Sequence, residues 1–243
     1  MTADIAFVLV NFNGIADTVE CVSSIQRCDS HAKIIIVDNG SENDEGDRIA
    51  KQWPEITTLK NAENRGWAGG NNTGIRRALG DGVEWICLLN NDTVVSDDFM
   101  KTHVESVKTF SDLRIYGPLI NEYDEREKLQ TASCFYNRKN HFGLLKDAEI
   151  EGDQKQIRCH DTDIVNGCCM LVHREVFESI GEIDEQFFLI CEESDFCLRA
   201  KANGYQPRVI ARTLVWHKHS VSFEKAGKPL QRYYLLRNLW RLI

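Results

Sequence analysis

Two short polar stretches carry residue types that could bind a metal ion and accept a proton. The first, residues 90–92 (Asn-Asn-Asp), ends the apolar run at 85–89. A short apolar run bounded by turn residues is typical of a buried strand, and open α/β sheets bind ligands beyond the carboxyl ends of their strands. Asp92 would there offer an oxygen ligand to a hard divalent cation. Taken alone, however, the stretch favours a turn, because Asn and Asp bond to nearby backbone.

The second stretch, residues 192–195 (Glu-Glu-Ser-Asp), places three carboxylates at the start of a predicted helix. The helix dipole favours acidic residues at this position, which explains them without any function. A carboxylate crowded by others has a raised pKa, however, as a general base requires. The apolar residues 187–191 before it indicate partial burial. Both explanations stay open at this point.

Two further polar residues follow predicted strands. Asp38 comes after the apolar residues 34–37 and could accept a hydrogen bond from a ribose hydroxyl or a pyrimidine N–H. Alone, it is better explained as the N-cap of the next helix. His217 follows the run at 209–215. A lone histidine is more often structural, but with an aspartate at another strand end it becomes a candidate second metal ligand.

The glycine-rich stretch 64–74 lacks the residues of the common phosphate motifs. Gly69 and Gly74 have the P-loop spacing. The residues that follow, Ile75 and Arg76, are not the lysine and hydroxyl residue that the motif needs, and no Gly-x-Gly-x-x-Gly occurs. Two interpretations carry equal weight. The stretch is either a loop whose backbone N–H groups bind an anion before a helix that starts near Ile75, or a tight turn that needs positive φ.

The hydrophobic pattern predicts an α/β fold with a mostly parallel sheet and helices on both faces. Apolar runs that predict strands lie at residues 5–10, 33–37, 56–60 and 85–90. Helical patterns separate them, and strands that alternate with helices imply right-handed crossovers in a parallel sheet. Because these strands end in Asn, Asp or Gly, their polar ends should collect on one edge of the sheet.

The second half of the chain is predicted to form a smaller lobe. A soft boundary near Gly117-Pro118 divides one integrated domain into residues 1–118 and 119–243. Residues 121–163 are polar and weakly periodic, which indicates irregular structure with short strands. Ordered elements are expected again at 164–172, 174–180, 192–203 and 209–215, with a basic aromatic helix at 232–243.

Bulk composition argues against several classes of protein. The chain has 243 residues and a net charge of −8, which disfavours nucleic acid as a partner. Nine cysteines, an odd number without a Cys-x-x-Cys pair, fit a reducing compartment. The N-terminus lacks the basic region of a secretory signal, and no apolar run reaches the ~20 residues that span a bilayer. We therefore expect a cytoplasmic protein.

Five motifs follow one another along the chain. They are residues 37–41 (Val-Asp-Asn-Gly-Ser), 64–72 (Asn-Arg-Gly-Trp-Ala-Gly-Gly-Asn-Asn), 88–92 (Leu-Leu-Asn-Asn-Asp), 192–199 (Glu-Glu-Ser-Asp-Phe-Cys-Leu-Arg) and 216–217 (Trp-His). Each is weak, but this order resembles family-2 inverting glycosyltransferases of the GT-A fold, and their bacterial rhamnosyltransferase-like branch in particular. The resemblance covers nearly the whole chain. It implies a Rossmann-like GT-A sheet with a smaller acceptor-side lobe, and sugar transfer from a UDP- or dTDP-linked donor to an acceptor hydroxyl in bacterial surface polysaccharide biosynthesis.

The resemblance also implies roles for individual residues. Those implied to bind the donor are Val10, Phe12, Asp38, Asn64, Gly66, Asn72 and Asn90. Asp92, as the last residue of the family's Asp-x-Asp motif, would bind Mg²⁺ or Mn²⁺ together with His217. Glu193 would be the catalytic base, and Glu192 and Asp195 would bind the acceptor.

The sequence departs from the family's pattern at two of these positions. Asn90 replaces the first aspartate of Asp-x-Asp, which removes one charge from the metal site, and Glu193 stands where the family usually has aspartate. These departures keep a non-catalytic nucleotide-sugar binding domain open as an alternative. A sugar-nucleotide pyrophosphorylase is a second alternative, although residues 11–14 (Asn-Phe-Asn-Gly), after the first strand, carry no basic side chain.

The acceptor is expected to be a glycan or a lipid-linked molecule. In the tail, residues 232–243, three arginines accompany two tyrosines and a tryptophan. This composition predicts peripheral contact with an anionic membrane at its inner face. Packing of the tail against the protein's own core is the alternative, and the slightly favoured one.

Overall fold

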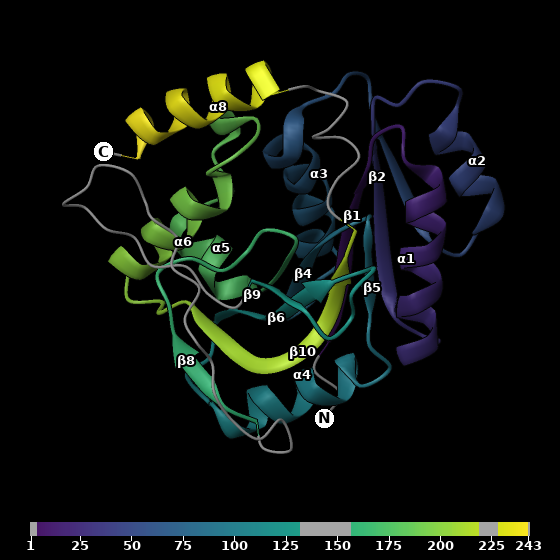
Figure 1. Cartoon of the computed structure of the whole chain (residues 1–243). Helices are drawn as coiled ribbons and strands as arrows, with labels where there is room; N and C mark the ends of the chain where they lie inside the picture. The colour runs from purple at the N-terminus through teal and green to yellow at the C-terminus, as the bar shows by residue number, and fades with distance from the viewer. Residues whose placement is uncertain (1–3, 132–156, 219–227, 243) are drawn as a thin grey trace.

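The computed structural model describes residues 4–131, 157–218 and 228–242, in which one sheet forms the centre of the molecule (Figure 1). Its strands lie in the order β3-β2-β1-β4-β9-β6-β10-β5, with β7 beside β6 and β8 beside β10. The strands are β1 (Ile5–Asn11), β2 (Lys33–Asn39), β3 (Thr57–Asn61), β4 (Trp85–Asn90), β5 (Thr93–Val95), β6 (Ile115–Glu122), β7 (Leu129–Thr131), β8 (Cys159–Asp161), β9 (Cys169–His173) and β10 (Arg208–His217). The predicted α/β fold is confirmed.

The first half of the chain builds the parallel part of the sheet. β3, β2, β1 and β4 run parallel to one another, as the alternation of strands and helices predicted. β9 pairs antiparallel with both β4 and β6, and β5 pairs antiparallel with β10, whereas β6 and β10 are parallel. Strands β5 and β9 therefore make the sheet mixed. The spatial order of β5, β6, β9 and β10 differs from their order in the sequence, so the sequence pattern did not predict which strands pair.

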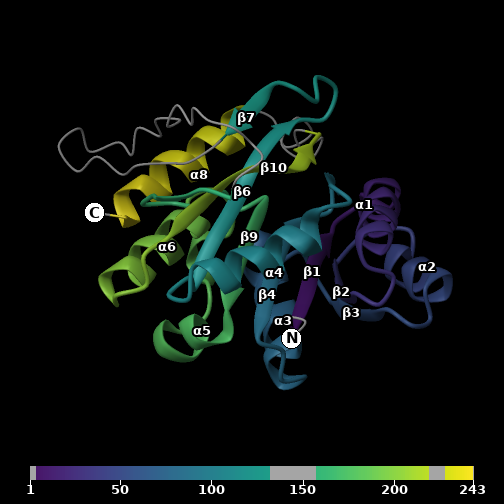
Figure 2. The same cartoon turned by 90° about the horizontal axis from the view of Figure 1, so that it is seen from below.

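Helices cover both faces of the sheet (Figures 1 and 2). Those on one face are α1 (Ile15–Cys28), α2 (Glu45–Gln52) and α4 (Phe99–Thr109), which contribute to one hydrophobic cluster. Those on the other face are α3 (Gly66–Gly80), α5 (Arg174–Ile180) and α6 (Glu192–Ala202), which contribute to a second cluster. The prediction of helices on both faces is confirmed.

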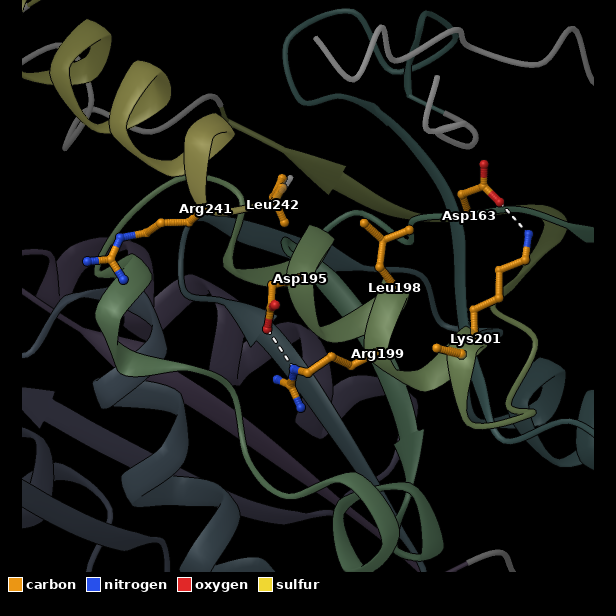
Figure 3. A pocket seen from close by; sticks show the side chains of 8 residues that line it. Asp163, Asp195, Leu198, Arg199, Lys201, Arg241 and Leu242 are labelled. Atoms are coloured by element: carbon orange, nitrogen blue, oxygen red, sulfur yellow. Dashed lines mark hydrogen bonds and ion pairs between the residues drawn. The ribbon is translucent and has the colours of Figure 1, made fainter. Parts of the chain in front are cut away.

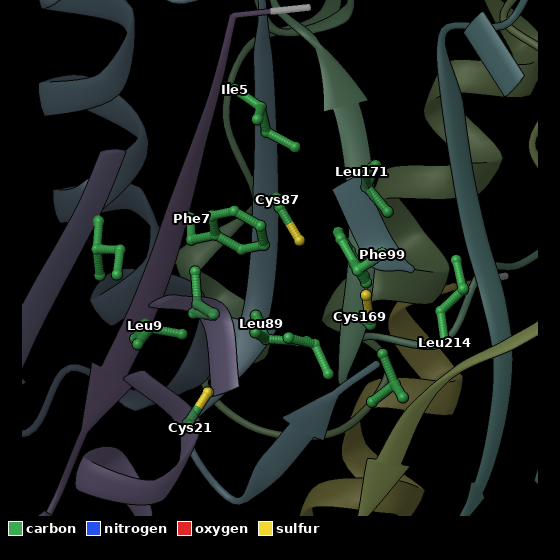
Figure 4. Close-up of a cluster of buried hydrophobic side chains, with 14 of the residues drawn as sticks. Ile5, Phe7, Leu9, Cys21, Cys87, Leu89, Phe99, Cys169, Leu171 and Leu214 are labelled. Carbon is green, nitrogen blue, oxygen red and sulfur yellow. The ribbon is translucent and has the colours of Figure 1, made fainter. Parts of the chain in front are cut away.

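Alternation along β1 produces the two clusters. Phe7 points into the first, where its ring centroid lies 5.5 Å from that of Phe99 on α4 (Figure 4). Val8 points into the second, where it packs against Gly74 of α3. Successive side chains of a strand point to opposite faces, so both faces of β1 are apolar and buried. The carboxyl end of β1 is thereby fixed between two layers of helices.

The predicted start of the third helix near Ile75 is wrong, because α3 begins at Gly66. A Cβ on Gly74 would lie 2.3 Å from the Val8 side chain, and one on Gly70 would also meet β1. Glycine at these positions therefore lets the helix backbone approach the strand. Since glycine destabilises a helix interior relative to alanine, the composition of this stretch indicated a loop, and packing against β1 offsets that preference.

The second half of the chain shares the sheet with the first. The predicted boundary at Gly117-Pro118 lies inside β6, so no linker separates the halves there, and the division stays a prediction. The middle of the irregular region, 132–156, lies outside the described residues. α8 (Lys228–Arg241) forms the predicted tail helix and lies beside α6 (Figures 1 and 2). No helix in the described part of the chain is long and apolar enough to cross a membrane.

Candidate active site

The carboxyl ends of β2, β1 and β4 lie side by side at one edge of the sheet. Asp38 pairs with Asn11 in the register of β2 and β1, and Val10 pairs with Asn90 in the register of β1 and β4. Asp92 comes two residues after the end of β4. The expectation that polar strand ends collect on one edge is therefore confirmed.

A buried amide holds Asp38 in place. Asn11 Nδ2 lies 3.1 Å from Asp38 Oδ1 and 3.0 Å from Glu45 Oε2, and Asn11 and Asp38 are 0% and 6% exposed. The N-cap position of α2 is occupied by Asp44, so Asp38 does not have the capping role that was its alternative explanation. Asn11 was not identified from the sequence as a site residue. It is the last residue of β1, as Asp38 is the second-last residue of β2. A carboxylate held in this way is suited to accept a hydrogen bond from a ligand.

Val10 and Phe12 lie at and just beyond the end of β1. Val10 is partly buried and lies against Gly70 of α3. Phe12 is 37% exposed, and an exposed ring next to the strand end offers a flat apolar surface to a nucleobase. Their contacts with a donor stay a prediction.

Asn64 and Gly66 form the turn that begins α3. Asn64 Oδ1 accepts the N–H of Gly66 at 2.9 Å and Nδ2 of Asn39 at 3.1 Å. Gly66 has a φ of +70°, and a Cβ there would lie 2.2 Å from Phe188 O. The tight-turn interpretation of the glycine-rich stretch therefore holds at Gly66, and the amide oxygen of Asn64 is used within the turn. The donor contacts of both residues stay a prediction.

Asn72 is 1% exposed, and its side-chain amide makes hydrogen bonds inside the protein. Its Nδ2 donates to Ile183 O at 2.8 Å and to Glu185 Oε1 at 3.1 Å, and its Oδ1 accepts from Ile183 N at 3.1 Å. These bonds join α3 to the short 3₁₀ helix η2 (Glu185–Phe187) and the residues before it. The predicted donor contact of Asn72 stays a prediction, and this placement gives it no support.

Asp92 and His217 come together at the same edge, although they are far apart in the chain. His217 Nε2 lies 3.2 Å from Asp92 Oδ1, and His217 Nδ1 lies 2.9 Å from Gln130 Oε1. An amide oxygen can only accept, so in a neutral ring the proton lies on Nδ1. Nε2 then presents a lone pair to the carboxylate, an arrangement that a cation between the two groups stabilises. The backbone N–H of Lys218 donates to Asp92 O at 3.0 Å and ties the two strand ends together.

These two residues fit a divalent cation that shares its ligands with a substrate. Asp92 is 7% exposed, and its Oδ1 has no hydrogen-bond partner in the described part of the chain. No group of three His, Cys, Asp or Glu side chains that could hold a metal ion occurs within residues 4–131, 157–218 and 228–242. Mg²⁺ often takes one or two protein ligands and completes its shell with water and substrate phosphates. A two-residue site therefore suits an ion that arrives with a diphosphate.

Glu193 is connected to this edge through Trp67. A Cβ on Gly167 would lie 3.2 Å from the Trp67 ring and 3.4 Å from Glu193 Cβ, so one glycine separates the two side chains. Trp67 Nε1 in turn donates to Asn90 Oδ1 at 2.9 Å, a contact that the sequence did not indicate. The amide at position 90 thus accepts an indole N–H where the family's motif has its first carboxylate. The candidate base therefore lies across one glycine from the tryptophan that contacts the end of β4.

Burial raises the pKa of Glu193 above the usual value for glutamate, and the residue as a whole is partly buried. The cause is burial, which the apolar residues 187–191 had indicated, and not the crowding by other carboxylates that the sequence had also suggested. Glu192 is 4% exposed, and burial, together with the charge of Glu193, raises its pKa well above the usual value. Of the two residues, Glu193 is the more exposed. The predicted contact of Glu192 with an acceptor stays a prediction, and its burial gives it no support.

Asp195 lies away from these groups. Its Oδ2 forms an ion pair with Arg199 Nε at 2.7 Å, and both residues line a cavity of about 510 Å³ between α6 and the end of α8 (Figure 3). Residues two apart on a helix are turned by about 200°, so Asp195 and Glu193 lie on opposite sides of α6. The predicted acceptor contact of Asp195 stays a prediction, and it would need an acceptor that extends around the helix.

Comparison with known proteins identifies a family for most of this structure. A family model described as Glycosyl transferase family 2 matches residues 6–181. The match contains the strand ends that carry Asp38, Asn90 and Asp92, and it stops before α6 and Glu193.

Two curated relatives illustrate the range of similar sequences. The low-salt glycan biosynthesis hexosyltransferase Agl10 of Haloferax volcanii is 26% identical over 205 residues, which cover 83% of this chain and 62% of that protein. The dTDP-rhamnosyl transferase RfbF of Shigella flexneri is 24% identical over 250 residues, which cover 100% of this chain and 81% of that protein.

Two solved structures have the same fold. GalNAc-T7, crystallised with UDP, GalNAc and Mn²⁺, superposes with a TM-score of 0.72 at 16% identity, covering 90% of this chain and 44% of that one. Residues 1–349 of TarS from S. aureus, in complex with UDP, give a TM-score of 0.62 at 12% identity, covering 98% of this chain and 65% of that one. These neighbours confirm the predicted GT-A fold. The chain spans less than two thirds of the Haloferax relative and of both structures.

Proposed function

The chain belongs to glycosyl transferase family 2, and we propose that it moves a sugar from a nucleoside-diphosphate donor to an acceptor hydroxyl with inversion at the anomeric carbon. The observation that carries the proposal is the meeting of the Asp92–His217 pair with the other strand ends at one sheet edge. Asp38 lies at that edge, and Glu193 lies across Gly167 from Trp67, which donates to Asn90 there. Nucleoside recognition, charge neutralisation and proton removal would thus have neighbouring sites.

The donor is proposed to be UDP- or dTDP-linked. Asp38, fixed by Asn11, would accept a hydrogen bond from the nucleoside, and Phe12 would contact the base. Support comes from RfbF, named as a dTDP-rhamnosyl transferase, and from the neighbours crystallised with UDP. The acceptor would be a glycan or a lipid-linked molecule of surface polysaccharide synthesis, since Agl10 is named for glycan biosynthesis.

Asp92 and His217 would hold the Mg²⁺ or Mn²⁺ ion. When bound, the ion supplies positive charge that stabilises the departing diphosphate. Asn90 adds no charge to this site, and Trp67 holds its amide oxygen. One carboxylate and one neutral imidazole leave the ion more positive than two carboxylates would, which favours binding of the doubly charged diphosphate.

Glu193 would act as the general base. Its carboxylate takes the proton of the acceptor hydroxyl while that oxygen forms a bond to the anomeric carbon from the side opposite the diphosphate. The bond between the anomeric carbon and the diphosphate oxygen breaks in the same step, and the electron pair leaves with the nucleoside diphosphate. A single displacement of this kind inverts the configuration. A pKa raised by burial makes Glu193 a stronger base than an exposed glutamate.

A panel of UDP- and dTDP-sugars, each with Mn²⁺, tests this function. We expect at least one donor to raise the melting temperature and to release its nucleoside diphosphate, slowly with water and faster with an acceptor. Binding without turnover for any acceptor tried would favour a nucleotide-sugar binding domain. Pyrophosphate formation from a sugar phosphate and a nucleoside triphosphate would identify a pyrophosphorylase.

The tail helix is proposed to touch an anionic membrane, where a lipid-linked acceptor is found. Tyr233, Leu236 and Trp240 are 57%, 55% and 79% exposed, and their spacing of three and four places them on one side of α8. Asn238, on the other side, is buried. α8 therefore packs on the protein through one face, as the alternative expected, and presents an aromatic and apolar face outward. Exposed Arg232 adds positive charge beside it.

Co-sedimentation with phosphatidylserine vesicles at low salt measures this contact. The double substitution Leu236→Ser and Trp240→Ser should weaken binding by at least about tenfold, because each side chain loses apolar area that lipid would bury. Leu129→Ser, which removes a hydrophobic side chain that is 41% exposed on β7, is the matched control and should bind like the unsubstituted protein. Failure of the unsubstituted protein to bind at low salt, where attraction is strongest, leaves α8 with a packing role alone.

A further inference from the structure

We propose that Asn238 and Arg237 of α8 are positioning residues that hold segment 186–190 and, through it, the base Glu193. The inference rests on the proposed function, because that function makes Glu193 the catalytic base. Segment 186–190 leads directly into α6, whose first turn contains Glu193. In the described part of the chain it has no partner strand, and its first two residues end η2. Its conformation therefore depends on contacts with other elements.

Five consecutive backbone carbonyls in this segment are held from outside it. Asn238 Nδ2 lies 2.9 Å from Phe187 O, 2.8 Å from Leu189 O and 2.5 Å from Ile190 O. Arg237 Nη2 lies 2.7 Å from Gln186 O and 2.8 Å from Phe187 O. The remaining carbonyl, that of Phe188, accepts the N–H of Trp67 at 2.8 Å. α8 and α3 thus hold the segment from two sides.

The segment needs this support because its backbone is in an unfavourable conformation. Phe188, Ile190 and Cys191 have φ values of +57°, +70° and +71°. None of them is glycine, and side chains with a Cβ avoid this region unless the surroundings enforce it. These three residues lie within four positions directly before α6. Loss of a contact from outside the segment would let the backbone relax there.

Relaxation there would move Glu193. Cys191 is the N-cap of α6, and its carbonyl accepts the N–H of Asp195 in the first turn. A change of φ at Ile190 or Cys191 therefore rotates the turn that carries Glu193. Phe188 O also holds the backbone N–H of Trp67, whose ring lies beside Gly167, the glycine that also adjoins Glu193. The same segment thus contacts both the turn that carries Glu193 and the backbone of Trp67.

The inner face of α8 is built for this contact. Asn238 is 0% exposed, on a helix whose other face is open to solvent. The rings of Tyr234 and Phe188 stack at 5.3 Å, and the Arg237 guanidinium lies 4.8 Å from the Tyr234 ring centroid. The buried Asn238 amide has two donor hydrogens and three carbonyl oxygens around it, so both hydrogens have acceptors. An apolar residue at position 238 would remove the donor of the Leu189 and Ile190 carbonyls, whereas Phe187 O would keep Arg237.

Asn238→Ala tests the proposal through kinetics. We expect kcat to fall by about 10²-fold, the effect of a displacement of about 1 Å in a catalytic group. The affinity for the nucleoside diphosphate with Mn²⁺, measured by calorimetry, should stay within about twofold, because the side-chain partners of Asp38 and Asp92 in the described residues are Asn11 and His217, not residues of α8. Arg237→Ala, which removes two of the bonds, should give a smaller loss of kcat in the same direction. Leu235→Ala, exposed on the same helix, is the control and should leave kcat unchanged.

A double-mutant cycle separates positioning from a general loss of structure. If Asn238 acts through Glu193, adding Asn238→Ala to Glu193→Gln should lower kcat little further. The proposal would be overturned if Asn238→Ala lowered kcat about 10²-fold in the Glu193→Gln background as well. It would also be overturned if Asn238→Ala alone left kcat unchanged. Hydrogen exchange gives a readout that needs no activity: amides 186–195 should exchange faster in Asn238→Ala, while those of β1 and β4 keep their protection. If the unsubstituted protein transferred no sugar, the proposed function would fail, and exchange alone would still decide whether α8 holds this segment.

Discussion

Glu193→Gln is expected to lower kcat by about 10²–10⁴-fold, the usual cost of removing a positioned general base, with little change in donor affinity. Glutamine keeps the size and shape of the side chain next to Gly167 and Trp67, but it cannot take the acceptor proton. The nucleotide is proposed to be held by Asp38 and by the metal site, neither of which includes Glu193. Steady-state kinetics with a soluble acceptor analogue, together with calorimetry for the donor, would measure both quantities.

The pH dependence of the unsubstituted enzyme should report the same group. Glu193 acts only when deprotonated, and burial raises its pKa. Activity is therefore expected to fall as the pH drops through that raised pKa, so the acidic limb of kcat should lie above 4.5, the ordinary value for glutamate. Glu193→Gln should lose this limb along with most of its rate.

Glu192→Gln and Asp195→Asn are the matched controls for Glu193. The first is buried and the second is paired with Arg199, so neither is expected to remove a proton from the acceptor. Their effects should appear in stability or in acceptor KM. Normal kcat for Glu193→Gln combined with loss of kcat in either control would show that the base is assigned to the wrong residue. If all three variants kept normal kcat, the general-base mechanism itself would be refuted.

Asp92→Asn should reduce transfer by a factor on the order of 10³, because it removes the only carboxylate proposed to hold the ion at the leaving diphosphate. The amide retains the shape of the side chain and could donate to His217 Nε2, which lies 3.2 Å from Asp92 Oδ1. The folded protein should therefore be no less stable without metal. EDTA should suppress the activity of the unsubstituted enzyme in the same way.

Metal binding by Asp92 can also be followed without measuring turnover. Mn²⁺ together with a nucleoside diphosphate should raise the melting temperature of the unsubstituted protein, since a ligand of the native state stabilises it. It should raise that of Asp92→Asn much less. Asp195→Asn, which also removes one negative charge but lies on the far side of α6, serves as the control and should respond like the unsubstituted protein. Full activity in EDTA would remove the metal from the mechanism.

The sequence by itself determined most of the elements and the places where polar residues follow strands. Runs such as 5–10 and 33–37 predicted β1 and β2, and the polar ends after them predicted the site edge. Helix ends were readable as well: α5 stops at Gly181, and Gly204, with a φ of +89°, follows α6. These features depend on neighbours in the chain, and the local pattern therefore contains them.

The tertiary structure decided which of the polar residues act together. The sequence placed Glu192, Glu193 and Asp195 in one helical turn, but only packing shows that Glu192 is buried and that Asp195 pairs with Arg199 on the other side of α6. It also decided the start of α3, because contact between Gly74 and Val8 outweighs the poor helix propensity of glycine.

Contacts between distant parts of the chain were likewise absent from the sequence pattern. Trp67 reaches Asn90, His217 reaches Asp92, and Asn238 reaches the segment before Glu193. Each of these pairs consists of residues with an ordinary local explanation, such as a turn, a strand end or a helix surface. Their partnership follows from how β4, β10 and α8 pack around the sheet edge, because a hydrogen bond or an ion site depends on distances in space that residue type and spacing do not specify.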